Sequence, residues 1–546
     1  MMPPSSEQGD VMIRTVFAAL SLVALATSMP AMAQADETER LIDEGMNRSQ
    51  VMTIAQEITD DLGPRLTNSP AMRRAETWAI DKFTGWGLSN VRRDAFDFGR
   101  GWEIISSSAR MTVPRTVQLT AIPIAWTPPT NGVLSGEVIV APMSKLRHFD
   151  EWKGKLAGKI VMVSMPGKGS EPDKPAFQRY TSEELGKLDA FSQPNYDPEA
   201  LNSRLKRVAF VEQLDAFLKA EGAIGWVRMS YRDGKLVHGE GYNFRKGRTL
   251  NLPGIELSAE DYRRLVRLTK TGRKPVIEFE NNVRYDDSDT NGYNIIAEIP
   301  GSDPKAGYVM AGAHFDSWVA GDGATDNGAG SAVVMEAARI LRTMGKPKRT
   351  IRFVLWSGEE QGLLGSRAYT EKYLAKREPK PGTDPYGLEA FYDWSYRYPI
   401  VAQPGYFDLK AYFNMDNGSG KFRGIYAEGN ATAVPLLKEW LSPFSGMDAS
   451  RVVASDTGGT DHVFMQQVGV PAYQFIQDPL DYSSRTHHSS ADTFDHLKAE
   501  DMRQAAVVMA GMLWQSANSA KTLPRQPLPV QPVVTDPFKV KDPDEE

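Results

Sequence analysis

The 546-residue sequence contains no cysteine and only seven histidines. Without cysteine the chain can form no disulfide bond, thiolate nucleophile or cysteine-ligated zinc site, so His, Asp and Glu would have to hold any metal. The net charge of −6, with no long basic run, gives no reason to expect a nucleic acid as partner. Hydrophobic residues make up 41% of the chain and charged residues 24%, which is typical of a globular protein. The length suffices for about two or three domains.

Long hydrophobic runs are also scarce. One apolar stretch, Val16–Ala26, follows a single arginine and precedes an Ala-Met-Ala sequence that ends at Ala33. This order is typical of an export signal, and the stretch is shorter than the roughly 18 residues that a membrane anchor, the alternative, would need. We expect a signal peptide over residues 1–33 and a mature chain that begins near Gln34. The mature protein would then be periplasmic or secreted, without a membrane partner.

Changes in sequence pattern divide the rest of the chain. Residues 34–113 begin with helical spacing of apolar residues and are expected to form the N-terminal part of a catalytic domain. Residues 114–285 alternate short strand-like runs with turns, as expected of a smaller inserted domain. Residues 286–522 would complete the catalytic domain. The Pro-rich, charged tail, 523–546, is expected to be flexible.

The segment after residue 286 alternates apolar runs with amphipathic helices. The runs are YVMAGA, IRFVLW, LKAYFNM and AYQFIQ, and the clearest helix spans Ala329–Met344. Near-continuous apolar strands that are separated by helices predict an α/β fold, with a mostly parallel central sheet covered by helices on both faces. In such sheets, functional groups collect at the carboxyl ends of the strands.

Those strand ends carry His, Asp and Glu side chains. The residues are His314, Asp316, Glu359, Glu360, Asp416, His487 and His488, and Asp326 lies in the turn before the Ala329 helix. Clustered carboxylates repel one another unless a cation neutralises them, so the pattern predicts a metal site. Imidazole and carboxylate ligands without sulfur suit zinc, with manganese or cobalt as alternatives. Two His and three carboxylates exceed one tetrahedral shell but fit two ions that share a bridging carboxylate.

The members of two residue pairs, His314 with Asp316 and Glu359 with Glu360, are expected to have different roles. Asp316, two residues after His314 along an extended strand, can accept a hydrogen bond from the second imidazole nitrogen. Adjacent glutamates point in different directions, so one of Glu359 and Glu360 can bind metal. The other can then exchange protons with a water, as a hydrolase requires.

The motifs HFDSW, GATDNGAGS, SGEEQGLLGS, NMDNG and HHSSADTFD occur in this order. Together they resemble the di-zinc peptidase family of bacterial leucyl aminopeptidases, glutamate carboxypeptidase and the transferrin receptor, particularly carboxypeptidase Q and its bacterial relatives. The resemblance implies an aminopeptidase/phosphorylase-like fold. The inserted segment, with LAGKIVMVSMPG, AEGAIGWV and LPGIELSAEDYRRL, resembles a β-rich protease-associated domain.

The family pattern implies two zinc ions per chain. It assigns His314 and Asp416 to the first ion, His488 and Glu360 to the second, Asp326 to the bridge, Glu359 to the general base and Asp316 to the orientation of His314. His487 is the alternative to His488, which is preferred because it stands four residues before an Asp-Thr pair. The tyrosine that family members often carry before the Asp of GGTDHVFM is absent, so no oxyanion-stabilising residue is assigned.

The resemblance implies an exported exopeptidase that hydrolyses short peptides or dipeptides, from the N-terminus, through a metal-bridging water activated by Glu359. A carboxypeptidase and a glutaminyl-cyclase-like or amide-hydrolysing enzyme are alternatives on the same scaffold. A non-catalytic receptor is an alternative of another class, which lost ligands would mark. A homodimer would suit the resemblance. The Tyr- and Trp-rich segment 376–399 is expected to be a lid, a dimer contact or an exposed loop.

Overall fold

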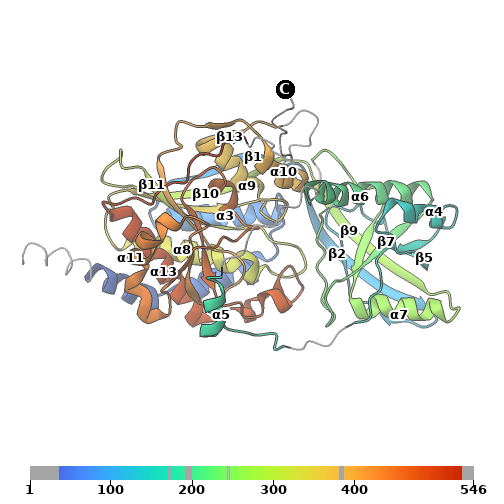
Figure 1. The fold of residues 1–546 in the computed structure, drawn as a ribbon. Helices are drawn as coiled ribbons and strands as arrows, with labels where there is room; N and C mark the ends of the chain where they lie inside the picture. Colours follow the sequence, from blue (N-terminus) through green and yellow to red (C-terminus); the bar gives the residue numbers. More distant parts are fainter. Residues whose placement is uncertain are drawn as a thin grey trace, which may run out of the picture.

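The computed structural model describes residues 36–169, 174–190, 200–242, 244, 246–379 and 387–531. The expected signal peptide lies outside the described residues. The chain forms two lobes, which Figure 1 shows side by side, each built on its own sheet. We call them the large lobe, which contains β1 and all strands from β10 onward, and the small lobe, which contains β2 to β9. No helix in the described part of the chain is long and apolar enough to cross a membrane.

The large lobe contains an eight-stranded mixed sheet. In spatial order its strands are β1 (Ser89–Asp97), β10 (Asn291–Ile299), β12 (Thr350–Trp356), β11 (Tyr308–His314), β15 (Leu409–Asn414), β18 (Ala472–Gln477), β16 (Phe422–Tyr426) and β17 (Arg451–Val453). The four central strands, from β12 to β18, are parallel. β1 and β10 pair antiparallel at one side, and β16 pairs antiparallel with β18 at the other. The predicted α/β fold is confirmed.

Helices cover both faces of this sheet. One face carries α2 (Val51–Gln56), α3 (Pro70–Gly85), α8 (Ala329–Arg342), α11 (Val434–Leu441) and α13 (Ala499–Asn518), and the other carries α9 (Leu364–Tyr369), α10 (Gly387–Asp393) and α12 (Val463–Gln466). Side chains of a strand alternate between the two faces. In β12, Phe353 and Leu355 therefore enter the first core, whereas Val354 and Trp356 enter the second. This double burial explains why the strands are continuously apolar.

The small lobe contains a second eight-stranded sheet. Its order is β3 (Val117–Gln118), β2 (Gly101–Val113), β9 (Val276–Asp286), β5 (Leu134–Val140), β6 (Ile160–Met162), β7 (Gly225–Met229), β8 (Gly254–Leu257) and β4 (Ala121–Pro123). Helices α6 (Ala200–Ala220) and α7 (Ala259–Lys270) pack on opposite faces. β2 lies in this sheet, so the sheet begins before the expected boundary at residue 114. Four consecutive exposed positions in β2 weaken the strand pattern that would have revealed it.

The lobes meet at an apolar cluster and are also joined by a connecting segment. Trp102, Trp126 and Phe244 of the small lobe pack there with Phe96 and Trp318 of the large lobe. Helix α5 (Ser182–Lys187) lies between β6 and β7 in the sequence but beside the large lobe in space (Figure 1). Its only buried residue packs against β17 and β18.

Part of the C-terminal tail packs on the large lobe. Leu523 is buried, and Asn430 donates a hydrogen bond to the carbonyl of Pro524 at 2.7 Å. The guanidinium of Arg525 donates to two carbonyls of the large lobe at 2.6 Å each. These contacts fix residues 523–525, whereas the tail was expected to be flexible from residue 523 onward. Residues 532–546 lie outside the described residues.

Candidate metal centre

The carboxyl ends of the central strands bring the predicted ligands together. His314 is the last residue of β11, Glu360 follows β12 and Asp416 follows β15. His488 lies in the loop after β18, and Asp326 lies in the turn Ala324–Gly328, where its backbone is not helical and which leads into α8. Parallel strands end at the same edge of a sheet, which explains how residues from distant parts of the sequence converge.

Asp326 lies between the two imidazoles. Its Oδ1 is 3.2 Å from His314 Nε2, and its Oδ2 is 3.2 Å from His488 Nε2. His314 Nε2 is also 3.5 Å from Asp416 Oδ1, and His488 Nε2 is 3.1 Å from Glu360 Oε2. The five residues thus form two donor groups, each with one imidazole and one carboxylate of its own, that share Asp326.

Unsatisfied buried atoms show that these groups fit metal ions. Among the described residues, His314 Nε2, Asp326 Oδ2 and Glu360 Oε1 are buried without a hydrogen-bond partner. Such atoms cost free energy unless something compensates for their lost hydration. Ligand atoms of these three residues, which come from both donor groups, lie within 4.8 Å of one another. All donor atoms are nitrogen or oxygen, which suits zinc and is also compatible with manganese or cobalt.

The charges at the site also favour a cation. Burial, aided by Asp326, raises the pKa of Glu360 to about 7 against the lowering effect of His488. Burial would also raise the pKa of Asp326, but its contacts with both imidazoles hold that pKa well below its usual range. Burial, with the charges of Asp416 and Glu360, raises the pKa of Glu359 well above its usual range against the effect of His314. A bound cation would relieve this repulsion between carboxylates.

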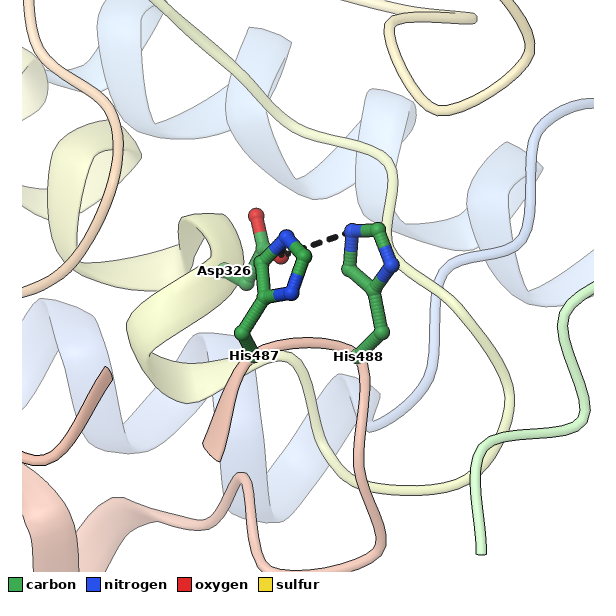
Figure 2. A group of neighbouring side chains, drawn as sticks. All are labelled: Asp326, His487 and His488. Atoms are coloured by element: carbon green, nitrogen blue, oxygen red, sulfur yellow. Dashed lines mark ion pairs between the residues drawn. The ribbon is translucent and has the colours of Figure 1, made fainter. Parts of the chain in front are cut away.

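The two adjacent histidines occupy different positions. Figure 2 shows both imidazoles beside Asp326, stacked with their ring centroids 3.7 Å apart. His488 contacts both Asp326 and Glu360, whereas His487 Nε2 is 4.0 Å from Asp326 Oδ2. The side chain of His487 is also 34% exposed, compared with 11% for His488. The geometry therefore favours His488 as a ligand and places His487 at the rim.

Asp316 contacts His314 differently from the expected way. His314 Nδ1 hydrogen-bonds to the backbone carbonyl of Asp316 at 2.9 Å, and the Asp316 carboxylate is 3.8 Å away. That carboxylate instead accepts hydrogen bonds from the hydroxyl of Thr67 at 2.8 Å and from the backbone N–H groups of Glu359 and Glu360 at 3.3 Å each. Asp316 thus fixes His314 through its main chain and fixes the glutamate pair through its side chain. The His-x-Asp spacing alone does not distinguish these two arrangements.

Arg65 holds the loop between His314 and Asp326. Its fully buried guanidinium donates to the carbonyls of Phe315, Ile58, Gly63, Asp322 and Gly323 at 2.7 to 3.1 Å. Burial lowers the pKa of Arg65 to about 10, so the side chain remains charged at neutral pH. The sequence offered no signal for this role, because the acceptors are backbone carbonyls.

A cavity of about 400 Å³ opens onto four of the five converging residues. Besides Asp326, Glu360, Asp416 and His488, its lining consists of Tyr242, Glu359, Gly362, Leu363, Phe391, Tyr392, Asn417, Gly459, Tyr482 and His487. Phe391 and Tyr392 come from the segment 376–399, so the described part of that segment forms a wall of the cavity. His314 and Asp316 lie behind this surface, where both are buried.

The small lobe also reaches the site, which the sequence did not predict. Glu240 Oε1 lies 2.7 Å from His488 Nδ1, and the Tyr242 hydroxyl is 3.3 Å from the same nitrogen. Burial would raise the pKa of Glu240, but the hydrogen bond and charge of His488 lower it to about 2. Glu240 stands 248 residues before His488, so no motif spacing relates the two.

Comparisons with known proteins agree with this geometry. Residues 294–513, which include every residue of the converging group, match the family model of peptidase family M28. The chain therefore contains a segment similar to M28 peptidases. Carboxypeptidase Q of Mus musculus is 27% identical over 476 residues, which cover 86% of each chain.

Two solved structures show the same fold as this chain. An M28 peptidase precursor from Shewanella amazonensis superposes with a TM-score of 0.64 at 24% identity, covering 91% of this chain and 99% of that one. A zinc aminopeptidase from Bacillus subtilis superposes with a TM-score of 0.54 at 17% identity, covering 87% and 97%. The resemblance that the motifs indicated is confirmed, and the protein is a metallopeptidase.

Proposed function

We propose that this metallopeptidase is an exported exopeptidase that holds two zinc ions and removes N-terminal residues from short peptides. The observation that carries the proposal is the position of Asp326 between His314 and His488, with one oxygen facing each imidazole. Asp416 would complete the first site and Glu360 the second. Zinc ions bound there would lower the pKa of an attacking water and polarise the scissile carbonyl.

Glu359 is the residue proposed to move the proton. It lines the cavity beside Glu360, and the hydrogen bond from its backbone N–H to Asp316 Oδ1 fixes its position. Its carboxylate would take a proton from the attacking water and deliver it to the leaving amine. Burial raises the pKa of Glu359 well above its usual range, which makes its carboxylate a stronger proton acceptor.

The charge of the cavity supports attack at the N-terminus. Its described lining includes Asp326, Glu359, Glu360 and Asp416 but neither Lys nor Arg. Two bound zinc ions would offset these four negative charges, but the lining still gives a terminal carboxylate no basic partner. Leu363, Phe391 and Tyr392 would contact apolar side chains of the substrate. The volume of about 400 Å³ suits one or two residues.

A carboxypeptidase is the second candidate. Its support is the similarity to carboxypeptidase Q, which extends over 86% of both chains. The glutaminyl-cyclase-like and receptor alternatives have less support, because all five expected ligands are present and converge. The proposed export rests on the N-terminal sequence, and the proposed partner is a peptide substrate.

A panel of blocked peptides tests the proposal. The mature protein would be incubated with one pentapeptide in free, N-acetylated and C-amidated forms, with and without a chelator, and the products identified by mass spectrometry. An aminopeptidase trims the free and amidated forms but not the acetylated form. Cleavage that amidation blocks would show a carboxypeptidase instead. If no chelator-sensitive cleavage occurs, the proposed activity is wrong.

A further inference from the structure

The small lobe makes direct hydrogen bonds to the loop that carries His487 and His488. Ser490 N donates to the carbonyl of Val237 at 2.8 Å, and Val237 N donates to the hydroxyl of Ser490 at 3.3 Å. The guanidinium of Arg232 donates to the carbonyl of His487 and, at 2.9 Å, to that of Ser483. The segment of the small lobe from residue 231 to 242 therefore pairs with this loop through both main chain and side chains.

The two imidazoles that flank Asp326 are oriented by different lobes. His314 Nδ1 hydrogen-bonds to the carbonyl of Asp316, two residues along the same chain segment. His488 Nδ1 instead contacts the Glu240 carboxylate of the small lobe at 2.7 Å. The hydrogen bond at one imidazole nitrogen determines which tautomer presents its other nitrogen to a metal. The two nitrogens that face Asp326 thus depend on different parts of the molecule.

The backbone of His488 also requires outside support. Its φ of 58° lies in the left-handed region, which residues other than glycine adopt uncommonly. Such conformations persist where the surrounding structure over-determines them, and they occur often at functional sites. The hydrogen bonds from Arg232 and with Val237 fix the residues directly before His488 and two residues after it.

Glu240 is itself held firmly. Its side chain is buried, and its Oε1 accepts a hydrogen bond from the Tyr231 hydroxyl at 3.3 Å. Its backbone carbonyl accepts one from Arg228, a residue of β7, at 3.2 Å. The Tyr231 ring stacks on His238, with ring centroids 3.9 Å apart. Glu240 therefore reaches across the lobe boundary from a rigid support.

We propose that Glu240 is a positioning residue that fixes the tautomer and orientation of His488, so that one of the two metal sites is assembled across the boundary between the lobes. The inference rests on the proposed two-zinc site. It assigns the small lobe a part in metal binding, beyond covering the site. Loss of a carboxylate that supports a ligand histidine typically lowers metal affinity about 10- to 100-fold.

The test compares three variants of the full-length mature chain. Glu240→Ala removes the carboxylate, and Glu240→Gln keeps an oxygen that can accept the Nδ1–H bond. Glu260→Ala is the matched control, because Glu260 accepts hydrogen bonds from the backbone N–H groups of Gly234 and Lys235 but lies away from His488. Each protein would be freed of metal and titrated with zinc against a coloured chelator of known affinity. Thermal unfolding would be followed in parallel.

We expect wild type and Glu260→Ala each to bind two zinc ions, with the same affinities in both proteins. In Glu240→Ala one site should weaken about 10- to 100-fold while the other is unchanged, and Glu240→Gln should recover most of the loss. Equal weakening of both sites, or the same affinities as wild type, would overturn the inference alone. Failure of the wild-type protein to bind two zinc ions would overturn the proposed function, and the inference with it.

Discussion

Arg65 allows a quantitative test of how the loop between His314 and Asp326 is held. Replacing Arg65 by Lys keeps the positive charge but reduces the number of N–H donors. A guanidinium carries five N–H donors spread over a plane, whereas a lysine ammonium carries three on a single nitrogen. Five carbonyls accept from Arg65, so at least two of them lose their partner. A buried carbonyl left unsatisfied costs about 1–3 kcal/mol. Because the contacts to the Gly63 and Asp322 carbonyls are only part-buried, the lower end applies, and the substitution should destabilise the large lobe by about 2 kcal/mol.

Calorimetry of the full-length protein would measure this effect. About 2 °C of melting temperature per kcal/mol is expected for a lobe of this size, so Arg65→Lys should lower the melting temperature by about 4 °C. Arg74→Lys is the matched control, since Arg74 is exposed on α3. Its melting temperature should stay within about 1 °C of wild type. Equal melting temperatures for both variants would refute the argument from lost backbone hydrogen bonds.

Three further changes test other parts of the site. Glu359→Gln should lower kcat by about 10²- to 10⁴-fold while zinc content, measured by atomic absorption, stays at the wild-type level; loss of both would make Glu359 a ligand. Removal of metal by a chelator should abolish hydrolysis, and added zinc should restore it, whereas activity in a metal-free sample would contradict a metal mechanism. Gly321→Ala should destabilise the protein in thermal unfolding, because the added carbon would lie 2.6 Å from the Ser489 carbonyl, and a wild-type melting temperature would contradict this.

The parts of the site that strand periodicity determines could be predicted from the sequence. The apolar runs predicted a central parallel sheet, and its geometry places the carboxyl ends of the strands at one edge. Residues directly after those runs, such as His314 and Asp416, were therefore foreseeable neighbours. Asp326 could be added because it precedes a strongly amphipathic helix.

Contacts that depend on how the lobes dock could not be predicted in this way. Glu240 and Tyr242 reach His488 only because the small lobe packs against the loop that carries it. Either the carbonyl or the carboxylate of Asp316 could accept a hydrogen bond from His314, and the His-x-Asp spacing does not determine which of them does. Likewise, β2 exposes four residues in a row, so it lacks the alternation that identifies a strand.

The pairing of β1 with β10 imposes an order on folding. β1 ends at Asp97 and its partner begins at Asn291, with the whole small lobe between them. The chain emerges from its N-terminus, so β1 appears before the whole small lobe and β10 after it. All strands of the small lobe exist before β10 does, so that lobe can form while β1, α2 and α3 still lack their partners. The segment that contains α2, α3 and β1 must therefore avoid non-native contacts until β10 is available to pair with β1.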